Sequence, residues 1–265
     1  MEDLSEIRNF CHAISASGGK DSTAMLLLMI EKEMPIDCVL YADTGVEFPE
    51  TRDHIAKLDK LLCRERGIHI TTLRHPHGFE WLMFDVPQHQ KRAIERRIAM
   101  GQPLHGYGWP GVRTRWCTGQ LKTHLIDKEV NRLKKEKDAL HYVGIAADET
   151  QRCKDDPQKR YPLVEWGVTE AQALQICYDR GFDFGGLYEI YHRASCWCCP
   201  LQRIDELRKL RTHHPELWAR LREMDNRARA MFGPGPLGQF KKNWSVEQLE
   251  ERFAREEKEA APYGL

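Results

Sequence analysis

Apolar residues in the first 145 positions fall into short blocks separated by amphipathic stretches, a pattern that predicts strands alternating with helices. The expected strands cover residues 10–15, 37–41, 69–73 and 140–145. The expected helices cover residues 23–33, 49–66 and 118–137. Repeated strand and helix units are typical of an α/β fold with a parallel sheet and helices on both faces. Functional groups of such folds gather where the strands end.

The C-terminal third has helix signals in place of strand patterns. Residues 169–172 (TEAQ) and 245–248 (SVEQ) have the spacing of a capping box, and Pro215 is suited to the first turn of a further helix. We therefore expect an α/β domain over residues 1–160. A mainly helical extension that carries a cysteine-rich segment is expected over residues 161–265.

The composition is that of a globular protein without a membrane segment. The 265 residues include 40 Lys and Arg and 40 Asp and Glu, so the chain has no formal net charge. No apolar run reaches the ~20 residues of a membrane span, and the acidic N-terminus does not resemble a signal peptide. We expect a cytoplasmic protein, in which the nine cysteines are thiols or metal ligands and not disulfides.

A run of small and charged residues joins the first expected strand to the first expected helix. It consists of Ser17, Gly18, Gly19, Lys20, Asp21 and Ser22. The glycines let backbone N–H groups converge on phosphate oxygens, the helix presents its positive end, and Lys20 adds a full charge. Because Asp21 stands where a Walker loop requires Ser or Thr, the sequence predicts a nucleotide phosphate site of another kind. The alternative is a plain glycine turn.

Polar residues also follow two other expected strands. Asp43 and Thr44 come at the end of the second strand, and Gly144 and Arg152 lie at and after the end of the fourth. An aspartate at this position is suited to holding Mg²⁺ on a leaving pyrophosphate, and it is equally suited to capping a helix or a turn. Arg152 is suited to bidentate contact with a phosphate or a sulfate.

Positive charge is concentrated in residues 86–137, where twelve Lys and Arg stand against four Asp and Glu. The helical part of this segment has opposite charges one turn apart, which is typical of a solvated helix face. Arg113 and Arg115 lie instead in a loop rich in Gly and Pro, between Trp109 and Trp116. Such a loop suits a tRNA or DNA backbone, although a chain without net charge predicts weak nonspecific affinity.

Four motifs, taken together and in this order, resemble the phosphoadenosine phosphosulfate (PAPS) reductase family, nearest to the branch that contains the DndC protein of bacterial DNA phosphorothioation. The motifs are SGGKDS (17–22), ADTGVEFPET (42–51), RWCTGQLK (115–122) and GIAADETQR (144–152). The resemblance implies a PP-loop, adenine nucleotide alpha-hydrolase-like fold. It also implies that residues 17–22, Asp43, Thr44 and Gly144 contact ATP, PAPS or adenylylsulfate with Mg²⁺, and that Lys20, Asp43 and Arg152 are catalytic.

Departures from the family pattern bear on the reaction. PAPS reductases attack the sulfonyl sulfur with a cysteine on a C-terminal tail, whereas residues 232–265 here contain no cysteine. Adenylylsulfate reductases of plants and bacteria carry a Cys-Cys pair where this chain has Trp116 and Cys117. The resemblance therefore favours a chemistry other than reduction to sulfite through a tail cysteine.

Three of the nine cysteines, Cys196, Cys198 and Cys199, lie within four residues in the sequence CWCCP. The C-x-x-C spacing of Cys196 and Cys199 brings two thiolates within reach of one metal centre, and a following Pro is common beside iron–sulfur ligands. Together with Cys117, Cys196 and Cys199 offer three thiolates to an iron–sulfur cluster, which we expect to be of the 4Fe-4S type. Three ligands leave one iron open to sulfide, as in the iron–sulfur tRNA thiolases, whereas Cys198 would close that position. Zinc bound by four thiolates and metal-free core thiols are the alternatives.

Three functions are compatible with these patterns. The first is an enzyme that adenylates an oxygen of its substrate and transfers sulfur to displace AMP, with a cysteine desulfurase or free sulfide as the sulfur donor. The second is a sulfonucleotide reductase that uses an external thiol. The third is a nucleotide-sensing module without turnover. The sequence identifies neither the acceptor nor the oligomeric state.

Overall fold

A five-stranded sheet forms the centre of the computed structural model, which describes residues 10–135 and 137–260. All neighbouring strands run parallel, in the order β3-β2-β1-β4-β5. The strands are β1 (Cys11–Ser15), β2 (Cys38–Asp43), β3 (Ile70–Arg74), β4 (Ala139–Val143) and β5 (Lys159–Arg160). Chain order reverses between β1 and β4, and Ser15 pairs with Val143, so these two strands end side by side. Ligands of open parallel sheets bind at such a switch point.

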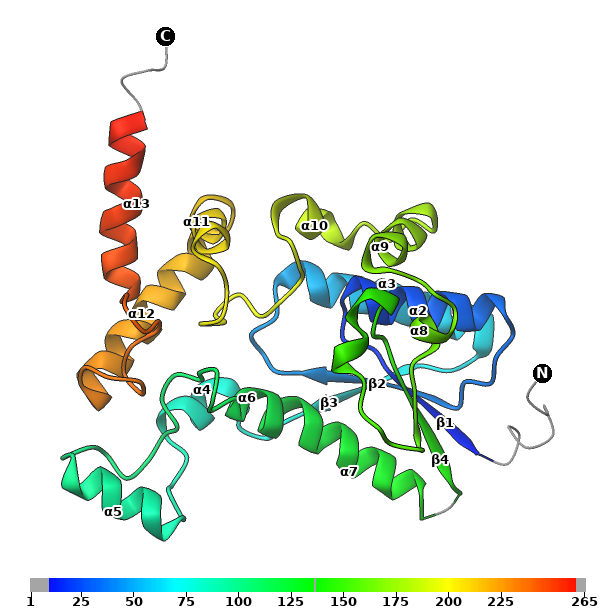
Figure 1. Cartoon of the computed structure of the whole chain (residues 1–265), viewed down its shortest axis with the longest axis horizontal. Coiled ribbons are helices and arrows are strands. Elements are labelled where there is room, and N and C mark those ends of the chain that lie inside the picture. The colour runs from blue at the N-terminus through cyan, green and yellow to red at the C-terminus, as the bar shows by residue number, and fades with distance from the viewer. Residues whose placement is uncertain (1–9, 136, 261–265) are drawn as a thin grey trace. The chain divides into compact units, whose positions relative to one another are not determined.

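Three helices cover the two faces of this sheet (Figure 1). They are α2 (Lys20–Glu31) and α3 (Pro49–Arg66) on one face and α7 (His124–Leu133) on the other. Ala13, Leu40 and Ala139 of the strands form a buried cluster with Val130 of α7. This packing fixes the strand ends from which the candidate site is built.

The described residues form two compact units. The first unit, unit 1, contains the described residues up to His75 and the segment Thr118–Ser195. Beyond the sheet and its three helices it contains short helical elements: η1 (Gly119–Thr123), η2 (Ala147–Arg152), α8 (Pro162–Glu165), α9 (Glu170–Asp179), η3 (Phe184–Gly186) and α10 (Leu187–Ile190). The expected capping box is present at the start of α9, because Thr169 and Gln172 bond each other reciprocally.

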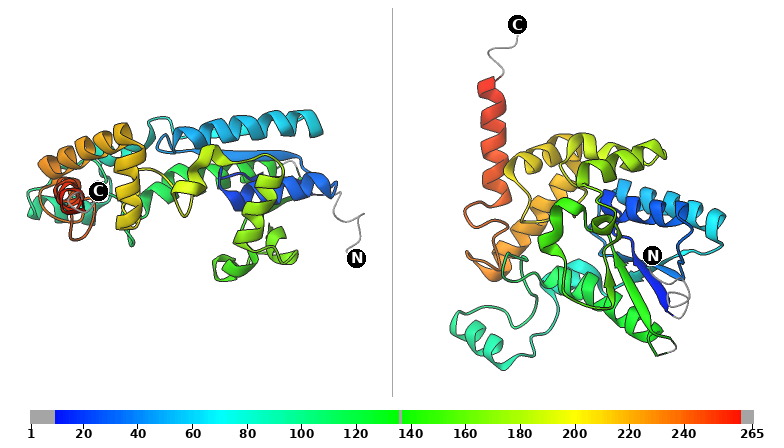
Figure 2. Two further views of the ribbon diagram at one scale, coloured as in Figure 1. Left: turned by 90° about the horizontal axis from the view of Figure 1, so that it is seen from above. Right: turned by 45° about the vertical axis from the view of Figure 1, so that its right-hand side comes forward.

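The second unit, unit 2, contains Pro76–Cys117 and the described residues from Cys196 onward. Its helices are α4 (Gly78–Phe84), α5 (Lys91–Ala99), α6 (Trp116–Thr118, whose last residue belongs to unit 1), α11 (Ile204–His213), α12 (Pro215–Phe232) and α13 (Val246–Ala260). Helix α13 runs across α12 and not along it (Figures 1 and 2). Arg222 of α12 forms a bidentate ion pair with Glu247 of α13.

A buried carboxylate organises unit 2. Asp225, on α12, is fully buried. Its Oδ1 accepts hydrogen bonds from Trp109 Nε1 at 3.0 Å and the Phe240 amide at 2.9 Å, and its Oδ2 accepts one from the Val246 amide at 2.8 Å. Burial raises the pKa of Asp225, while these three donors oppose the increase. One side chain thus ties together three segments that are distant in sequence.

The α/β fold with a parallel sheet and a mainly helical C-terminal part is confirmed. The helix expected at 23–33 begins earlier, at Lys20, because the glycine run opens directly into it. Helices α4 and α5 were not expected, since apolar residues are sparse and charges frequent in α5. The domain boundary near residue 160 stays a prediction. Within the described residues no helix combines the length and apolarity that crossing a membrane requires.

Candidate active site

The loop between β1 and α2 is shaped by its glycines. Gly18 has φ +78°, and a Cβ atom there would lie 2.7 Å from Cγ2 of Thr51. Gly19 precedes the helix with an extended backbone and no side-chain cap. Any larger residue at position 18 would therefore be strained in its backbone and crowded by α3. The first turn of α2 is left with backbone N–H groups at its end, as an anion site requires.

The two serines of the loop hold each other. The Ser17 amide donates to Ser22 Oγ at 3.0 Å, the two hydroxyl oxygens lie 3.0 Å apart, and Ser22 Oγ donates to the Gly19 carbonyl at 3.1 Å. These bonds fix the turn. Both serines thus have a structural role in the loop in addition to the nucleotide contacts predicted for them.

Lys20 is the charged centre of the loop. Its side chain is 9% exposed, and its Nζ lies 2.5 Å from Glu170 Oε1 and 3.3 Å from Asp21 Oδ1. Burial acts to lower the pKa of Lys20, but the hydrogen bond to Glu170 and the charge of Asp21 outweigh it, so the pKa is raised. The backbone amide of Lys20 donates to the hydroxyl of Tyr188, on α10, at 2.9 Å. Lys20 is therefore a permanent cation.

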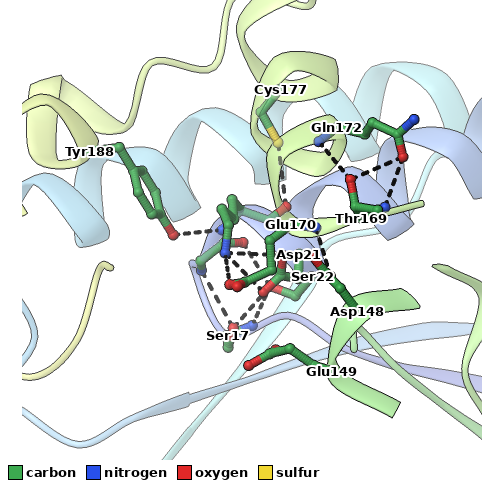
Figure 3. Close-up of polar contacts among 12 residues, drawn as sticks. Ser17, Asp21, Ser22, Asp148, Glu149, Thr169, Glu170, Gln172, Cys177 and Tyr188 are labelled. Atoms are coloured by element: carbon green, nitrogen blue, oxygen red, sulfur yellow. Dashed lines mark hydrogen bonds and ion pairs between the residues drawn. The ribbon is translucent and has the colours of Figure 1, made fainter. Parts of the chain in front are cut away.

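Three carboxylates converge beside this lysine. Oxygens of Asp21, Glu149 and Glu170 lie within 4.8 Å of one another, and each residue is partly exposed. Burial raises the pKa of Asp21; Lys20 opposes this, and the charges of Glu170 and Glu149 raise it further. Figure 3 shows these side chains gathered at the loop from α2, η2 and α9. A hard divalent cation such as Mg²⁺ prefers oxygen ligands of this kind.

Sequence reasoning missed Glu149 and Glu170 as members of this group. Glu149 lies within the motif GIAADETQR, directly after the strand that ends next to β1. Glu170 follows the capping residue Thr169, and its amide is bonded to Asp148 Oδ1 at 3.0 Å. The helix signal at Thr169 was visible in the sequence, but the position of that helix relative to the loop was not.

Asp43 and Thr44 are engaged at the end of β2. Asp43 Oδ1 accepts from the Gly45 amide at 2.9 Å, and its Oδ2 lies 2.8 Å from Arg74 of the neighbouring strand. Burial opposes the ionised form, but the Gly45 amide and Arg74 outweigh it and lower the pKa of Asp43. The Thr44 hydroxyl donates to Glu47 Oε1 at 2.6 Å. Asp43 is thus not part of the three-carboxylate group, and its magnesium role stays a prediction.

Gly144 and Arg152 are at the two ends of the segment that follows β4, because Gly144 comes directly after the strand and Arg152 is the last residue of η2. A Cβ atom on Gly144 would lie 2.6 Å from the Cα atom of Ser22, so this glycine allows β4 to end against the first turn of α2. Arg152 forms an ion pair with Glu149 and keeps about half of its side chain exposed. Its predicted contact with a phosphate or sulfate therefore requires a change of partner.

All four predicted cluster ligands belong to unit 2. Cys117, Cys196 and Cys199 are partly exposed, whereas Cys198 is buried. All nine cysteines lie among the described residues and are thiols. Among those residues, no three cysteine sulfurs lie within 4.8 Å of one another, the spacing that a single metal ion requires. A 4Fe-4S cube holds its ligand sulfurs farther apart than one zinc ion does.

Two side chains donate hydrogen bonds to backbone carbonyls of the cysteine segment and of the residues that follow it. The buried Gln202 donates its Nε2 hydrogens to the carbonyls of Cys196 at 2.7 Å and Trp197 at 3.0 Å. Lys241 Nζ donates to the carbonyls of Pro200 at 2.7 Å and Gln202 at 2.6 Å. Burial lowers the pKa of Lys241, and the nearby Cys199 opposes this effect. The turn is thus fixed through its backbone carbonyls.

The part of the chain that contains the loop and Lys20 matches a known family. A family model for the phosphoadenosine phosphosulfate reductase domain matches residues 11–201, well over half of the chain. The chain belongs to this family. The family is named for the enzymes that reduce phosphoadenosine phosphosulfate (PAPS).

Three curated relatives of this PAPS reductase domain protein are named as uncharacterized proteins. One, from Methanocaldococcus jannaschii, is 25% identical over 77% of this chain and 39% of its own length. A second protein of that organism is 20% identical over 82% of this chain and 48% of its own length. The chain thus spans less than half of either protein. An uncharacterized 37.8 kDa protein of Escherichia phage 186 is 24% identical over 91% of this chain and 82% of its own length.

Two solved structures resemble the protein at 15% sequence identity. A PAPS reductase from Candida auris, in a phosphate complex, aligns with a TM-score of 0.42 over 67% of this chain and 76% of its own. The U34-tRNA thiolase NcsA from Methanococcus maripaludis, with its 4Fe-4S cluster, aligns with a TM-score of 0.38 over 93% of this chain and 72% of its own.

Proposed function

We propose that this PAPS reductase domain protein is an ATP-dependent sulfur-transfer enzyme of the DndC-like kind. The observation that supports this most is the convergence of Lys20 with a group of three carboxylates at the phosphate loop. Lys20 would neutralise a pyrophosphate that departs from an attacked α-phosphate, and a divalent cation held by the carboxylates would supply further positive charge there. A phosphate oxygen would replace the Tyr188 hydroxyl as the acceptor for the Lys20 amide.

The proposed reaction has two displacements. An oxygen of the acceptor attacks the α-phosphorus of ATP, and pyrophosphate leaves with the bonding electrons. Sulfide then attacks the acceptor atom that bears the adenylated oxygen, the bond from that atom to the oxygen breaks, and AMP leaves with the bonding electrons. When a cysteine desulfurase is the sulfur donor, an external thiol first reduces its persulfide to sulfide and is itself oxidised to a disulfide. Within this scheme Lys20 stabilises the pyrophosphate. Asp43, at the end of β2, and Arg152, at the end of η2, keep their proposed catalytic roles.

An iron–sulfur cluster is the metal centre that we propose for the cysteines. Of the four predicted ligands, Cys117, Cys196 and Cys199 are partly exposed, and among the described residues no three cysteine sulfurs lie at the spacing of one ion. The buried Cys198 is then a packing residue, which leaves the cluster with three protein ligands and one open iron. Such a cluster would supply a binding site for sulfide.

Nucleotide chemistry is tested by supplying ATP and sulfide to the anaerobic protein together with a tRNA or DNA pool, and measuring AMP and pyrophosphate. The proposal predicts equal amounts of AMP and pyrophosphate, dependent on acceptor and abolished in Lys20→Ala. Lys128→Ala, on the exposed face of α7, is the control. ATP binding without AMP release under any acceptor would instead favour a nucleotide-sensing module.

Metal content tests the cysteine assignment independently. Cys117→Ser, Cys196→Ser and Cys199→Ser should each lose iron and visible absorbance from anaerobically purified protein. Cys198→Ser should retain the cluster, and so should Cys63→Ser, a matched change on α3 of unit 1. Zinc in the wild-type protein, or loss of iron from Cys198→Ser, would contradict the three-cysteine assignment.

Membership in the family favours a second candidate, reduction of PAPS or adenylylsulfate by an external thiol. That reaction needs a thiolate that attacks sulfur and forms a thiosulfonate. Residues 200–265 of this chain offer no cysteine for it. We therefore expect no sulfite from PAPS with thioredoxin as reductant. Sustained sulfite release would make the reductase the better assignment.

A further inference from the structure

Unit 2 contains a pocket that the proposed chemistry does not use. Its volume is about 580 Å³, within the range of small-molecule sites. Three separate segments line it, and most of its surface is apolar. The lining includes Pro110, Pro200, Pro236, Phe240, Lys242 and Trp244. The residues around Pro200 directly follow the cysteine segment, so the pocket adjoins that part of the chain.

Hydrogen bonds fix residues 240–244, which form one wall of this pocket. Lys241 and Trp244 form an antiparallel bridge, with N–H to carbonyl distances of 3.1 and 3.3 Å. The Lys241 ammonium is bonded to two carbonyls of the opposite segment, and the amide of the buried Phe240 is bonded to Asp225. These contacts leave Lys242 and Asn243, at the tip of the turn, exposed at the pocket.

The rim of the pocket is cationic. Lys242 is exposed, and the exposed Arg113 and Arg115 follow the lining residue Val112, whose side chain is 77% exposed. In the described part of the chain, none of these three cations has a carboxylate within 4.0 Å. Unit 2 as a whole carries 19 Lys and Arg against 14 Asp and Glu. A polyanion is therefore the complementary partner for this face.

The shape and the charge together indicate one ligand class. Proline rings and Trp244 line the pocket. Arg252 Cζ lies over the Trp244 ring, 5.3 Å from its centroid, so a nucleobase would stack on the other face, and nearby cations can hold the phosphates on either side of it. Asn243 offers both a donor and an acceptor to the edge of a base. A paired base cannot enter a pocket, because its faces are stacked and its edge is bonded to its partner. Trp109, expected at this interface, cannot contribute because it is buried against Asp225.

We infer that the pocket of unit 2 binds an unpaired nucleobase of a single-stranded nucleic acid, with Lys242, Arg113 and Arg115 on the adjoining phosphates. This inference rests on the proposed function only in naming the acceptor class, because the binding site itself lies outside the nucleotide loop. The accepted strand would thus be held next to the cysteine segment of the same unit.

The test is fluorescence anisotropy with labelled oligouridylate, oligothymidylate and a duplex, each of about 12 nucleotides. The wild-type protein should bind single strands at least tenfold more tightly than the duplex. Comparison of the two single strands distinguishes RNA from DNA as the source of the base. Equal affinity for single strand and duplex would overturn the inference.

Point variants separate stacking from charge. Trp244→Ala should weaken single-strand binding by about 5-fold to 150-fold, because one stacked base contributes about 1–3 kcal/mol, whereas Trp244→Phe should retain most of it. Trp166→Ala, in unit 1, is the matched control. Lys242→Ala should lower affinity for every sequence and reduce the salt slope by about 1; Lys258→Ala, on α13, should not.

Two further measurements keep the result independent of folding and of ATP chemistry. Titration with a nonhydrolysable ATP analogue should give the same affinity for Trp244→Ala and wild type, which shows an intact unit 1. If ATP binding is absent in both proteins but oligonucleotide binding depends on Trp244, the proposed function fails and the inference stands. If polyglutamate displaces the oligonucleotide equally well and Trp244→Ala changes neither affinity, the cationic face binds polyanions without the pocket and the inference is wrong.

Discussion

Unit 1 and unit 2 assemble their candidate functional groups by different means. In unit 1 the phosphate loop is six consecutive residues, and tertiary structure adds carboxylates from η2 and α9 to a site that the local sequence has already shaped. In unit 2 long-range contacts do more of this work. Gln202 fixes the cysteine segment locally, but Lys241 and Asp225 join the pocket wall and the start of α13 to distant segments through long-range hydrogen bonds.

This difference has an energetic consequence. A local turn depends on backbone conformation, and its loss damages one site. A buried polar group that joins distant segments affects a whole unit, because removing it leaves several donors without water or partner. Unit 1 should therefore be sensitive in function, whereas unit 2 should be sensitive in stability.

The largest effect is expected at Asp225. Asp225→Ala leaves three buried donors unpaired, so unit 2 should lose about 3–5 kcal/mol of stability. Hydrogen exchange followed by mass spectrometry checks this, with protection lost in α12 and α13 and retained in the sheet. Asp205→Ala, on an exposed position of α11, is the control. Equal loss of protection in both units would show that they do not differ as argued.

Acid should act mainly on unit 1. Burial lowers the pKa of His54 and of His141 to about 4, from an ordinary value of 6.5. Between these values the unfolded chain binds protons that the folded chain does not, so stability is complete above pH 6.5 and falls as the pH drops toward 4. From about pH 7.5 to about pH 5 each histidine should remove about 2 kcal/mol.

Unfolding in denaturant at several pH values measures this slope. His54→Phe keeps a ring stacked on Phe184, whose centroid lies 4.3 Å from that of His54, and should flatten the dependence by about one proton. His89→Phe, at an exposed position of unit 2, should leave the slope unchanged. A slope that survives in His54→Phe would assign the effect to other groups.

Substitution of Lys20 should separate the two units most clearly, because it should weaken nucleotide binding in unit 1 and leave the stability of unit 2 nearly unchanged. Lys20→Ala should weaken binding of a nonhydrolysable ATP analogue by about 1.5–3 kcal/mol, the range for charged hydrogen bonds, with little change in the stability of unit 2. Tyr188→Phe removes the hydroxyl that occupies the Lys20 amide, so its affinity should be equal or higher. Isothermal titration calorimetry distinguishes the two variants. Unchanged affinity in Lys20→Ala would place the phosphate site elsewhere.

The same contrast explains how far the sequence could be interpreted. The sequence could predict the strands, the helix that follows the glycine run and the phosphate loop. The period of the hydrophobic pattern, the glycines and the charge of Lys20 are all properties of neighbouring residues. The pairing of Asp43 with Arg74 could not, since it depends on the register that places these residues opposite each other on β2 and β3. Glu149 and Glu170 were missed for a related reason.

Less of unit 2 than of unit 1 could be predicted from the sequence. Cys196 and Cys199 were recognisable by spacing, but the burial that separates Cys198 from them comes from packing. Helix α5 was missed because Arg97, which a charge count treats as exposed, is buried and donates to the carbonyls of Pro103, His105 and Gly106. Such an anchor has no signature in the local pattern.

The smallest expected effect tests whether unit 1 depends on close backbone packing as well as on charge. Gly144→Ala places a Cβ atom 2.6 Å from the Cα atom of Ser22, and backbone at that distance can yield only by moving the first turn of α2. We expect a loss of about 1–3 kcal/mol in stability, as for other overpacked sites, and weaker binding of the ATP analogue.

Gly119→Ala is the matched control for this last variant. A Cβ atom at Gly119 would meet no atom of the described structure within 4 Å, and the residue lies in a helical turn, where alanine is favoured over glycine by about 0.5–1 kcal/mol. Thermal unfolding should therefore move in opposite directions for the two glycines. If Gly144→Ala unfolds at the wild-type temperature and binds ATP normally, α2 tolerates displacement, and the loop depends on its charges alone.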